Sequence, residues 1–157
     1  MMEIQDLTVP SEHLKAKELL KNWAWLFEPR LEIVMITKLG DAFLIEPQSG
    51  EIFFLDTLDG ELESIADSIA DFRELLNDRE FVIDYFSLEL LAPLMHLSMP
   101  DNTVYSFKEP PVLGGEVSSD NLELFDIATH FDDMGRLWCE IDQLAQEMEE
   151  ENPDATT

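Results

Sequence analysis

Apolar residues recur at helical spacing near both ends of the chain. After Ser11, a good helix N-cap, they repeat every three or four positions: Ala16, Leu19, Leu20, Trp23, Leu26 and Phe27. This predicts a helix that ends before Pro29, because the residue preceding a proline avoids helical backbone angles. The clearest stripe lies near the C-terminus and predicts a long amphipathic helix: Met134, Leu137, Trp138, Ile141, Leu144, Ala145 and Met148.

Short runs of β-branched and aromatic residues fill the middle of the chain. The runs cover residues 31–36, 42–45 and 52–55, and a further short one covers 62–66. Turn sequences separate them, namely Gly40-Asp41, residues 47–50 and Asp59-Gly60. Because short loops join neighbouring runs, the pattern favours an antiparallel meander.

The remaining segments predict further helices and one strand. Ser68 caps a helix, with Asp71 as its capping-box partner. A second helix is expected over 87–97 and a strand over 104–107. Residues 110–115 are expected to be irregular, since their prolines lack donors and their glycines favour turns. Residues 122–131 fit a strand or a helix equally well.

These elements together predict an α+β fold with a mostly antiparallel sheet packed against helices. A length of 157 residues suits one domain. We expect that domain to span residues 1–148, and residues 149–157 to form an acidic flexible tail.

Charge is the unusual feature of the composition. The chain has 9 Lys+Arg and 35 Asp+Glu, a formal net charge of −26. Residues 39–157 hold 4 basic and 29 acidic residues, so nearly all of this charge lies there. Phosphate backbones and anionic membranes would repel such a surface. We therefore expect neither nucleic acid nor a membrane as a partner, which leaves solubility or a basic protein partner as the reason for the charge.

The expected compartment is the cytoplasm. No apolar run approaches the ~20 residues of a membrane span. Residues 1–6 lack the basic and apolar regions of a secretory signal. Cys139 is the only cysteine, which excludes an internal disulfide and suits a reducing environment.

Candidate chemistry is sparse. His130 precedes Asp132 and Asp133, but no second histidine or cysteine has ligand spacing, so we expect no metal and no cofactor. His130 is expected instead to be partly buried and hydrogen-bonded to backbone. Cys139 lies beside an apolar stripe, where thiols are usually inert. Gly114-Gly115 lacks the lysine of a phosphate-binding loop. The sequence therefore predicts a protein that is not an enzyme.

Several segments carry a family resemblance. Residues 40–44 and 49–57, the stretch 105–116, and then Asn121 and residues 128–131 resemble the C-terminal domain family of type VI secretion immunity proteins, antitoxins of DNase effectors. The likeness runs over about residues 20–145. Residues 63–72 are also similar, more faintly, to the strand-to-helix segment of the SUKH superfamily of toxin-immunity proteins.

The resemblance implies that the protein binds and neutralises a cognate toxin, a basic nuclease effector, through its acidic surface. Acidic loop residues are the expected toxin contacts: Asp56, Asp59, Glu61, Glu63, Glu109, Glu116 and Asp120. The shared motif residues are expected to be structural: Gly40, Asp41, Gly50, Tyr105, Pro110, Pro111, Gly114, Gly115 and His130.

Three alternatives stay open at this point. One is a SUKH-like regulatory binding module with an unrelated partner. Another is a DNA mimic, although the acidic residues are scattered and do not follow the periodic spacing of phosphates. The third is a hydrolase, which would need two facing carboxylates with shifted pKa values.

Overall fold

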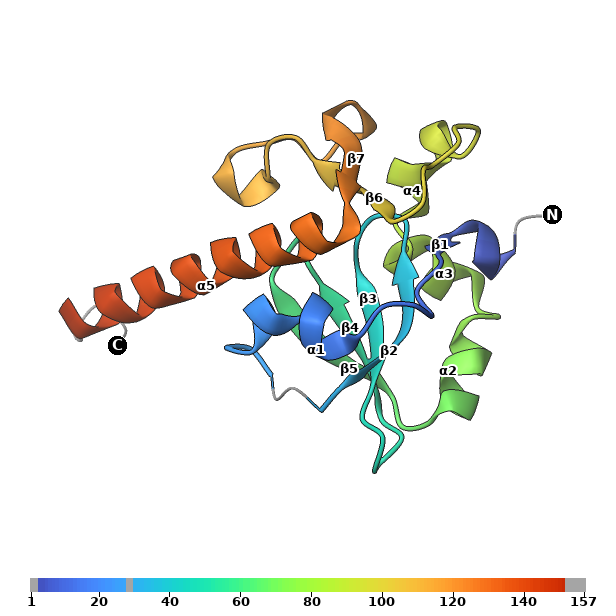
Figure 1. Ribbon diagram of the computed structural model, residues 1–157, viewed down its shortest axis with the longest axis horizontal. Coiled ribbons are helices and arrows are strands. Elements are labelled where there is room, and N and C mark those ends of the chain that lie inside the picture. The colour runs from blue at the N-terminus through green and yellow to red at the C-terminus, as the bar shows by residue number, and fades with distance from the viewer. Residues whose placement is uncertain (1–2, 28–29, 152–157) are drawn as a thin grey trace.

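The computed structural model describes residues 3–27 and 30–151, and a five-stranded antiparallel sheet lies at its centre (Figure 1). The strands run in the order β1 (Thr8–Val9), β2 (Glu32–Thr37), β3 (Ala42–Ile45), β4 (Ile52–Asp56) and β5 (Glu61–Ala66). Neighbouring strands are consecutive in the sequence, so the predicted meander is confirmed. The short edge strand β1, which pairs with β2, was not predicted.

A separate two-stranded sheet pairs β6 (Thr103–Phe107) with β7 (Leu122–Asp126). The connection between them, residues 108–121, carries two single 3-10 turns, η4 (Pro111–Leu113) and η5 (Ser119–Asn121). The prediction that residues 110–115 lack regular structure is therefore wrong at η4, where proline satisfies the angles of a first helical turn. The ambiguous stretch 122–131 is first strand β7 and then the start of the C-terminal helix.

Short helices follow β5 and cover one face of the sheet (Figure 1). They are α2 (Ile69–Leu75), α3 (Arg79–Tyr85), α4 (Leu88–Leu91) and the 3-10 turn η3 (Ala92–Leu94). The Ser68 hydroxyl accepts a hydrogen bond from the backbone N–H of Asp71 at 3.1 Å, as the predicted N-cap requires. The helix predicted over 87–97 is wrong in extent, since Pro93 lacks the donor that would continue α4. The sequence pattern also missed α3.

The predicted N-terminal helix is wrong. Residues 3–27 instead form η1 (Ile4–Asp6), β1, a one-turn α1 (Ala16–Leu19) and the 3-10 turn η2 (Lys21–Trp23). Ser11 is not its cap, because α1 begins after Lys15. The indole of Trp23 donates to the carbonyl of Phe131 at 2.9 Å, a contact with the C-terminal helix that overrides the local helical preference. The predicted end before Pro29 lies outside the described residues.

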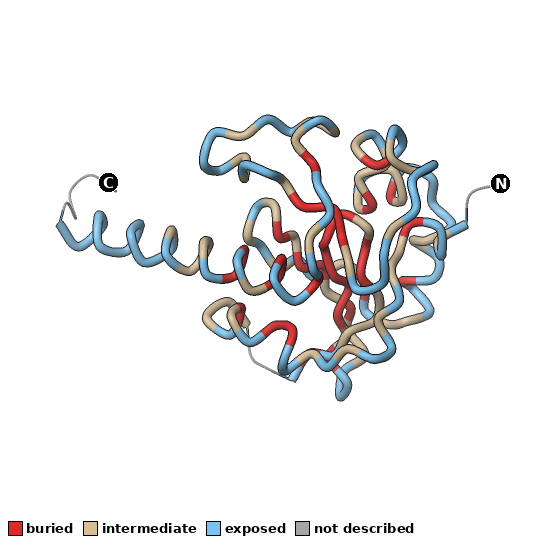
Figure 2. The backbone as a smooth tube through the Cα atoms, turned by 45° about the horizontal axis from the view of Figure 1, so that its top comes forward, coloured by how far each residue is buried: buried red, intermediate tan, exposed pale blue. Residues whose placement is uncertain are grey.

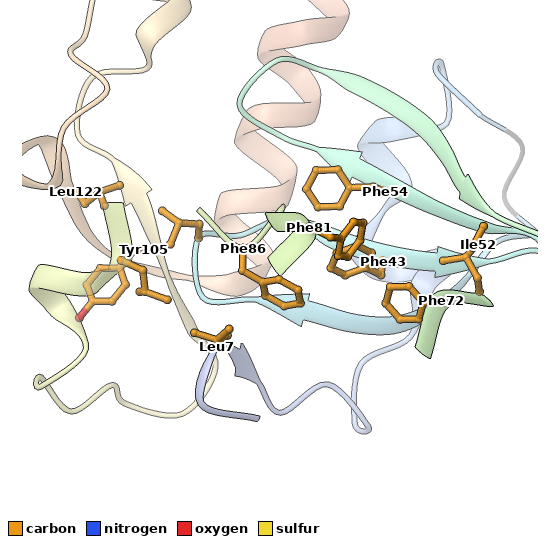
Figure 3. Packing of buried hydrophobic residues seen from close by; sticks show 12 residues of the cluster. Leu7, Phe43, Ile52, Phe54, Phe72, Phe81, Phe86, Tyr105 and Leu122 are labelled. Atoms are coloured by element: carbon orange, nitrogen blue, oxygen red, sulfur yellow. The ribbon is translucent and has the colours of Figure 1, made fainter. Parts of the chain in front are cut away.

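Both faces of the sheet are covered. On β3, Phe43 points into a cluster with residues of α2–α4, whereas Ala42 and Leu44 point into a second cluster with α1, η2 and the C-terminal helix. The aromatic rings of the first cluster gather around Phe43 (Figure 3), with the ring centroids of Phe54 and Phe72 each 4.9 Å away. The buried residues are concentrated in the central strands and on the helical faces that pack against them (Figure 2).

The C-terminal helix α5 (Ile127–Glu151) begins earlier and ends later than the apolar stripe that predicted it. Its buried residues all lie between Ile127 and Gly135, and its second half extends away from the domain (Figure 1). Glu149–Glu151 complete the helix, and the rest of the predicted tail, residues 152–157, lies outside the described residues. Among the described helices, none is long and apolar enough to cross a membrane.

Candidate functional site

A buried polar cluster joins α5 to both sheets. The His130 Nε2 atom lies 2.8 Å from the carbonyl oxygen of Gly40, in the β2–β3 turn. Its Nδ1 atom lies 2.8 Å from the hydroxyl of Ser106 on β6. The Thr57 hydroxyl, at the end of β4, donates to Asp41 Oδ1 at 2.9 Å. The imidazole therefore connects three segments far apart in the sequence.

Burial controls the ionisation of this cluster. It lowers the pKa of His130 to about 4, so the imidazole is neutral near pH 7. The pKa of Asp41 is raised to about 8, first by burial and second by the negative charge of Asp56. Hydrogen bonds from Thr57 to the Asp41 carboxylate act in the opposite direction but are weaker. Burial thus favours the neutral forms of both His130 and Asp41.

The Ser106–His130 contact has the distance of a hydrolase nucleophile and base, but its surroundings differ. Ser106 and His130 are only 6% and 4% exposed, and Thr57 is 2% exposed. The second imidazole nitrogen faces a backbone carbonyl of the protein itself. Ser106, His130, Asp41 and Thr57 line only a small cavity of about 20 Å³, and their hydrogen bonds join α5 to both sheets.

Two glycines make this joint possible. Gly40 has a φ of +79°, and a Cβ there would lie 2.2 Å from His130 Nε2. Gly60, in the β4–β5 turn, has a φ of +69°, and a Cβ there would lie 2.4 Å from the Trp138 ring. The Trp138 indole donates to the Thr57 carbonyl at 3.1 Å. Close approach of α5 to both turns therefore requires glycine at these positions.

The first group of predicted contact residues surrounds the β4–β5 turn. The Asp56 carboxylate is half-buried and accepts from the backbone N–H groups of Leu58 and Asp59, so it shapes the turn. Its pKa is raised to about 6, mainly by burial. Asp59, Glu61 and Glu63 are exposed, and Glu63 accepts a hydrogen bond from Tyr85 at 3.0 Å. The turn and the start of β5 thus present three solvent-facing carboxylates.

The second group lies on the 108–121 connection. Asn121 holds this loop closed: its Nδ2 donates to the carbonyls of Glu109 at 2.8 Å and Glu116 at 2.9 Å, and its Oδ1 accepts from the Glu109 N–H at 3.2 Å. The side chains of Glu109, Glu116 and Asp120 remain exposed. Within the described chain, no hydrogen bond or ion pair joins them to the β4–β5 group.

The motif residues of this loop determine its backbone path. A Cβ on Gly115 would lie 1.8 Å from the Glu109 carbonyl oxygen, and Gly114 has a φ of +108°. Pro110 and Pro111 precede and begin η4. Elsewhere, Gly50 takes a φ of +81° in the β3–β4 turn, and Tyr105 is buried with its hydroxyl lacking a hydrogen-bond partner.

The same loop exposes apolar side chains that sequence reasoning did not single out. Val112, Leu113 and Val117 are 40%, 57% and 59% exposed, and Leu124 on β7 is 39% exposed. In the sequence, the three loop residues lie between Glu109 and Asp120, which belong to the second group of predicted contacts. The sequence offers one sign of this exposure. Val112 and Leu113 are an apolar pair beside Gly114, in a segment too rich in proline and glycine to form the regular structure that would bury them.

Other possible sites do not include the predicted contacts. A groove of about 580 Å³ is lined by residues such as Phe27, Arg30, Glu46 and Phe53, and none of the seven acidic residues predicted to contact a toxin lines it. In residues 3–27 and 30–151, no group of three or more His, Cys, Asp or Glu side chains is placed to hold a metal ion.

One family model matches part of the chain. Residues 66–136 match the model of a family described as "T6SS immunity protein Tdi1, C-terminal". The predicted family resemblance is thereby confirmed. The matched region includes β6, the 108–121 loop, β7 and His130, whereas the strand pair at 40–57 lies outside it.

Structural comparison gives a likeness of fold. The crystal structure of Atu4351 from Agrobacterium tumefaciens superposes with a TM-score of 0.52 at 16% sequence identity. The alignment covers 77% of this chain and 61% of that chain, so the present chain spans about three fifths of that protein's length. No protein with curated annotation matches the chain.

Proposed function

We propose that this protein is an antitoxin, which binds and neutralises a cognate bacterial toxin. The observation that carries the proposal is the match of residues 66–136 to a family of type VI secretion immunity proteins. The chemistry of the fold supports a binding role, because its Ser–His contact is buried and serves as a joint. In this proposal the protein acts by binding and does not catalyse a reaction.

The toxin is proposed to be a basic nuclease. An enzyme that holds nucleic acid needs a positively charged cleft, and a net charge of −26 would attract it. Electrostatic steering can raise association rates to about 10⁸–10⁹ M⁻¹s⁻¹ at low salt. Such rates suit an inhibitor that has to capture a toxin before it cuts.

Two exposed features are proposed to contact the toxin. One is the β4–β5 turn with Asp59, Glu61 and Glu63, and the other is the 108–121 loop with its three carboxylates. The exposed Val112 and Leu113 side chains of that loop would add the apolar contacts that usually dominate binding energy. Asp56 supports this surface by shaping the turn. The proposed effect is occlusion of the toxin cleft.

Co-expression with the product of the adjacent open reading frame tests the function. The toxin alone should stop growth of a sensitive host, and the wild-type protein should restore growth and co-purify with it. A triple variant, Glu109→Lys, Glu116→Lys and Asp120→Lys, should rescue poorly at equal expression. Lack of both rescue and co-purification by the wild type would contradict the proposal. Capture of a single non-toxic partner would favour a SUKH-like regulatory module.

A further inference from the structure

The second half of α5 has an apolar face that nothing in the described chain covers. Leu144 and Met148 are 58% and 68% exposed, whereas Met134, on the same stripe, is buried. Leu137, Ile141, Leu144 and Met148 follow spacings of four, three and four residues, which align them on one side of a helix. Along this side Leu137 still packs against the core, whereas Leu144 and Met148 are exposed. Figure 2 shows this half of α5 exposed and extending beyond the rest of the molecule.

Carboxylates surround this face. Residues 137–151 contain no lysine or arginine and six acidic residues: Glu140, Asp142, Glu147, Glu149, Glu150 and Glu151. Four of these acidic residues lie within the last five residues of the helix, at the negative end of its dipole. Cations normally stabilise that end, and carboxylates there are unfavourable. The free half of α5, residues 140–151, therefore has an apolar face with no partner in the described chain, and it contains no lysine or arginine.

The uncovered apolar face and the uncompensated carboxylates together determine which kind of partner fits this helix. A second copy of the chain could cover the apolar face, but it would place two sets of six carboxylates along one seam, where like charges repel. A helix with its own apolar stripe flanked by lysines or arginines would cover the face and neutralise the acidic flanks. It would also place positive charge near the unfavourable helix end.

We propose that the free half of α5 binds a basic amphipathic helix of the toxin, pairing its Leu144–Met148 face with the apolar stripe of that helix. The inference rests on the proposed antitoxin function and specifies part of the toxin's chemistry. The mode is helix pairing, in which residues spaced three and four apart on each partner interdigitate. The contact is separate from the loops proposed to occlude the cleft, so it adds affinity by a second attachment.

The test compares variants of matched exposure in binding to the purified toxin. Leu144→Gln with Met148→Gln keeps good helix formers on exposed positions, so the fold should survive, as circular dichroism will check. This pair should raise the dissociation constant at least tenfold. Leu97→Gln, at a leucine that is 46% exposed but outside α5, is the control and should change it less than twofold. Backbone amides of 140–151 should also exchange hydrogen more slowly in the complex.

The outcomes separate the two proposals. If the wild type binds the toxin and the α5 pair binds equally well, with unchanged exchange in 140–151, the helix inference is wrong and the antitoxin function stands. If the wild type does not bind the toxin, both fail. If the wild type is a dimer in sedimentation experiments and the α5 pair is a monomer, the face pairs two copies of this chain, which also overturns the inference.

Discussion

The imidazole Nε2 of His130 lies 2.8 Å from the carbonyl oxygen of Gly40, although 90 residues separate them in the sequence. The contact fastens the first turns of α5 to the β2–β3 turn. The imidazole Nδ1 contacts the hydroxyl of Ser106 on β6, which attaches the two-stranded sheet to the same histidine. The orientation of α5, and with it that of the free helical half, therefore depends on this buried joint.

Substitution of Gly40 by alanine should strongly destabilise the fold. The φ of +79° costs an alanine about 1–2 kcal/mol, and its Cβ would overlap His130. We expect a loss of about 3 kcal/mol or more in the free energy of unfolding, measured by urea denaturation. Gly50→Ala is the matched control, because Gly50 has a φ of +81° but its Cβ would meet only Asp67 O at 3.9 Å. It should lose only about 1–2 kcal/mol.

A double-mutant cycle isolates the overlap with the imidazole. In a His130→Ala background the clash is absent, so Gly40→Ala should cost only its backbone strain of about 1–2 kcal/mol. Equal costs of Gly40→Ala in the two backgrounds would show that His130 does not confine this turn.

The pKa of Asp41 predicts how stability varies with pH. In the folded protein it is raised to about 8 from 3.8, so folding favours the protonated acid and stability falls as pH rises through this interval. The pKa of His130 is lowered to about 4 from 6.5, so its contribution is lost as pH falls below 6.5. Above pH 6.5 the free energy of unfolding therefore changes with pH through Asp41 and not through His130.

Between pH 6.5 and 8 the wild type should lose up to about 1.4 kcal/mol of unfolding free energy per pH unit. Asp41→Asn keeps an oxygen that can accept from Thr57 and cannot ionise, so it should flatten this slope. Urea denaturation at several pH values measures both. A flat wild-type profile, or an unchanged slope in the variant, would refute the assignment to Asp41.

Local patterns predicted the central sheet because its strands are short and its turns carry their own signals. The runs of β2, β3 and β4 are rich in apolar residues that are β-branched or aromatic, and the turns place Gly40, Gly50 and Gly60 at positive φ. Those turns set the register without distant information. The sequence pattern does not show which elements cover each face of the sheet. On β3, Ala42, Phe43 and Leu44 are all buried, so this strand is buried on both faces.

Distant contacts explain what the sequence did not predict. The N-terminal stripe predicts one helix, but Trp23 and Trp25 donate their indole N–H groups to carbonyls of α5 more than 100 residues away, and this tertiary contact breaks the helix. The C-terminal stripe correctly indicated a helix, yet a stripe does not show what covers it. In the candidate site, acidic loop residues were identifiable by type, whereas the roles of Thr57 and Trp138 depend on the packing of α5.

Asn121 should control the order of the proposed contact loop. Asn121→Ala removes three hydrogen bonds to Glu109 and Glu116, so amides of 109–116 should exchange hydrogen about tenfold faster. The core should be little affected, because the loop lies outside it. Asn77→Ala, which removes one exposed hydrogen bond to Arg73, should leave this loop unchanged. Unaltered exchange in 109–116 would mean that Asn121 does not hold the loop.

Salt should slow association with the toxin. If the carboxylates steer the encounter, the association rate should fall at least tenfold between about 20 mM and 500 mM ionic strength. Glu109→Gln, Glu116→Gln and Asp120→Asn together should lower the low-salt rate severalfold. Glu74→Gln, Glu80→Gln and Asp84→Asn remove the same charge from α2 and α3, and should do less. A rate independent of salt would show that the charge does not steer binding.

The most direct test of the antitoxin account is a titration of the purified toxin's activity with this protein. Activity should disappear at about one equivalent, and it should return when the proposed loop carboxylates are replaced by lysine. Toxin activity that persists in the presence of a large excess of the correctly folded protein would contradict the account.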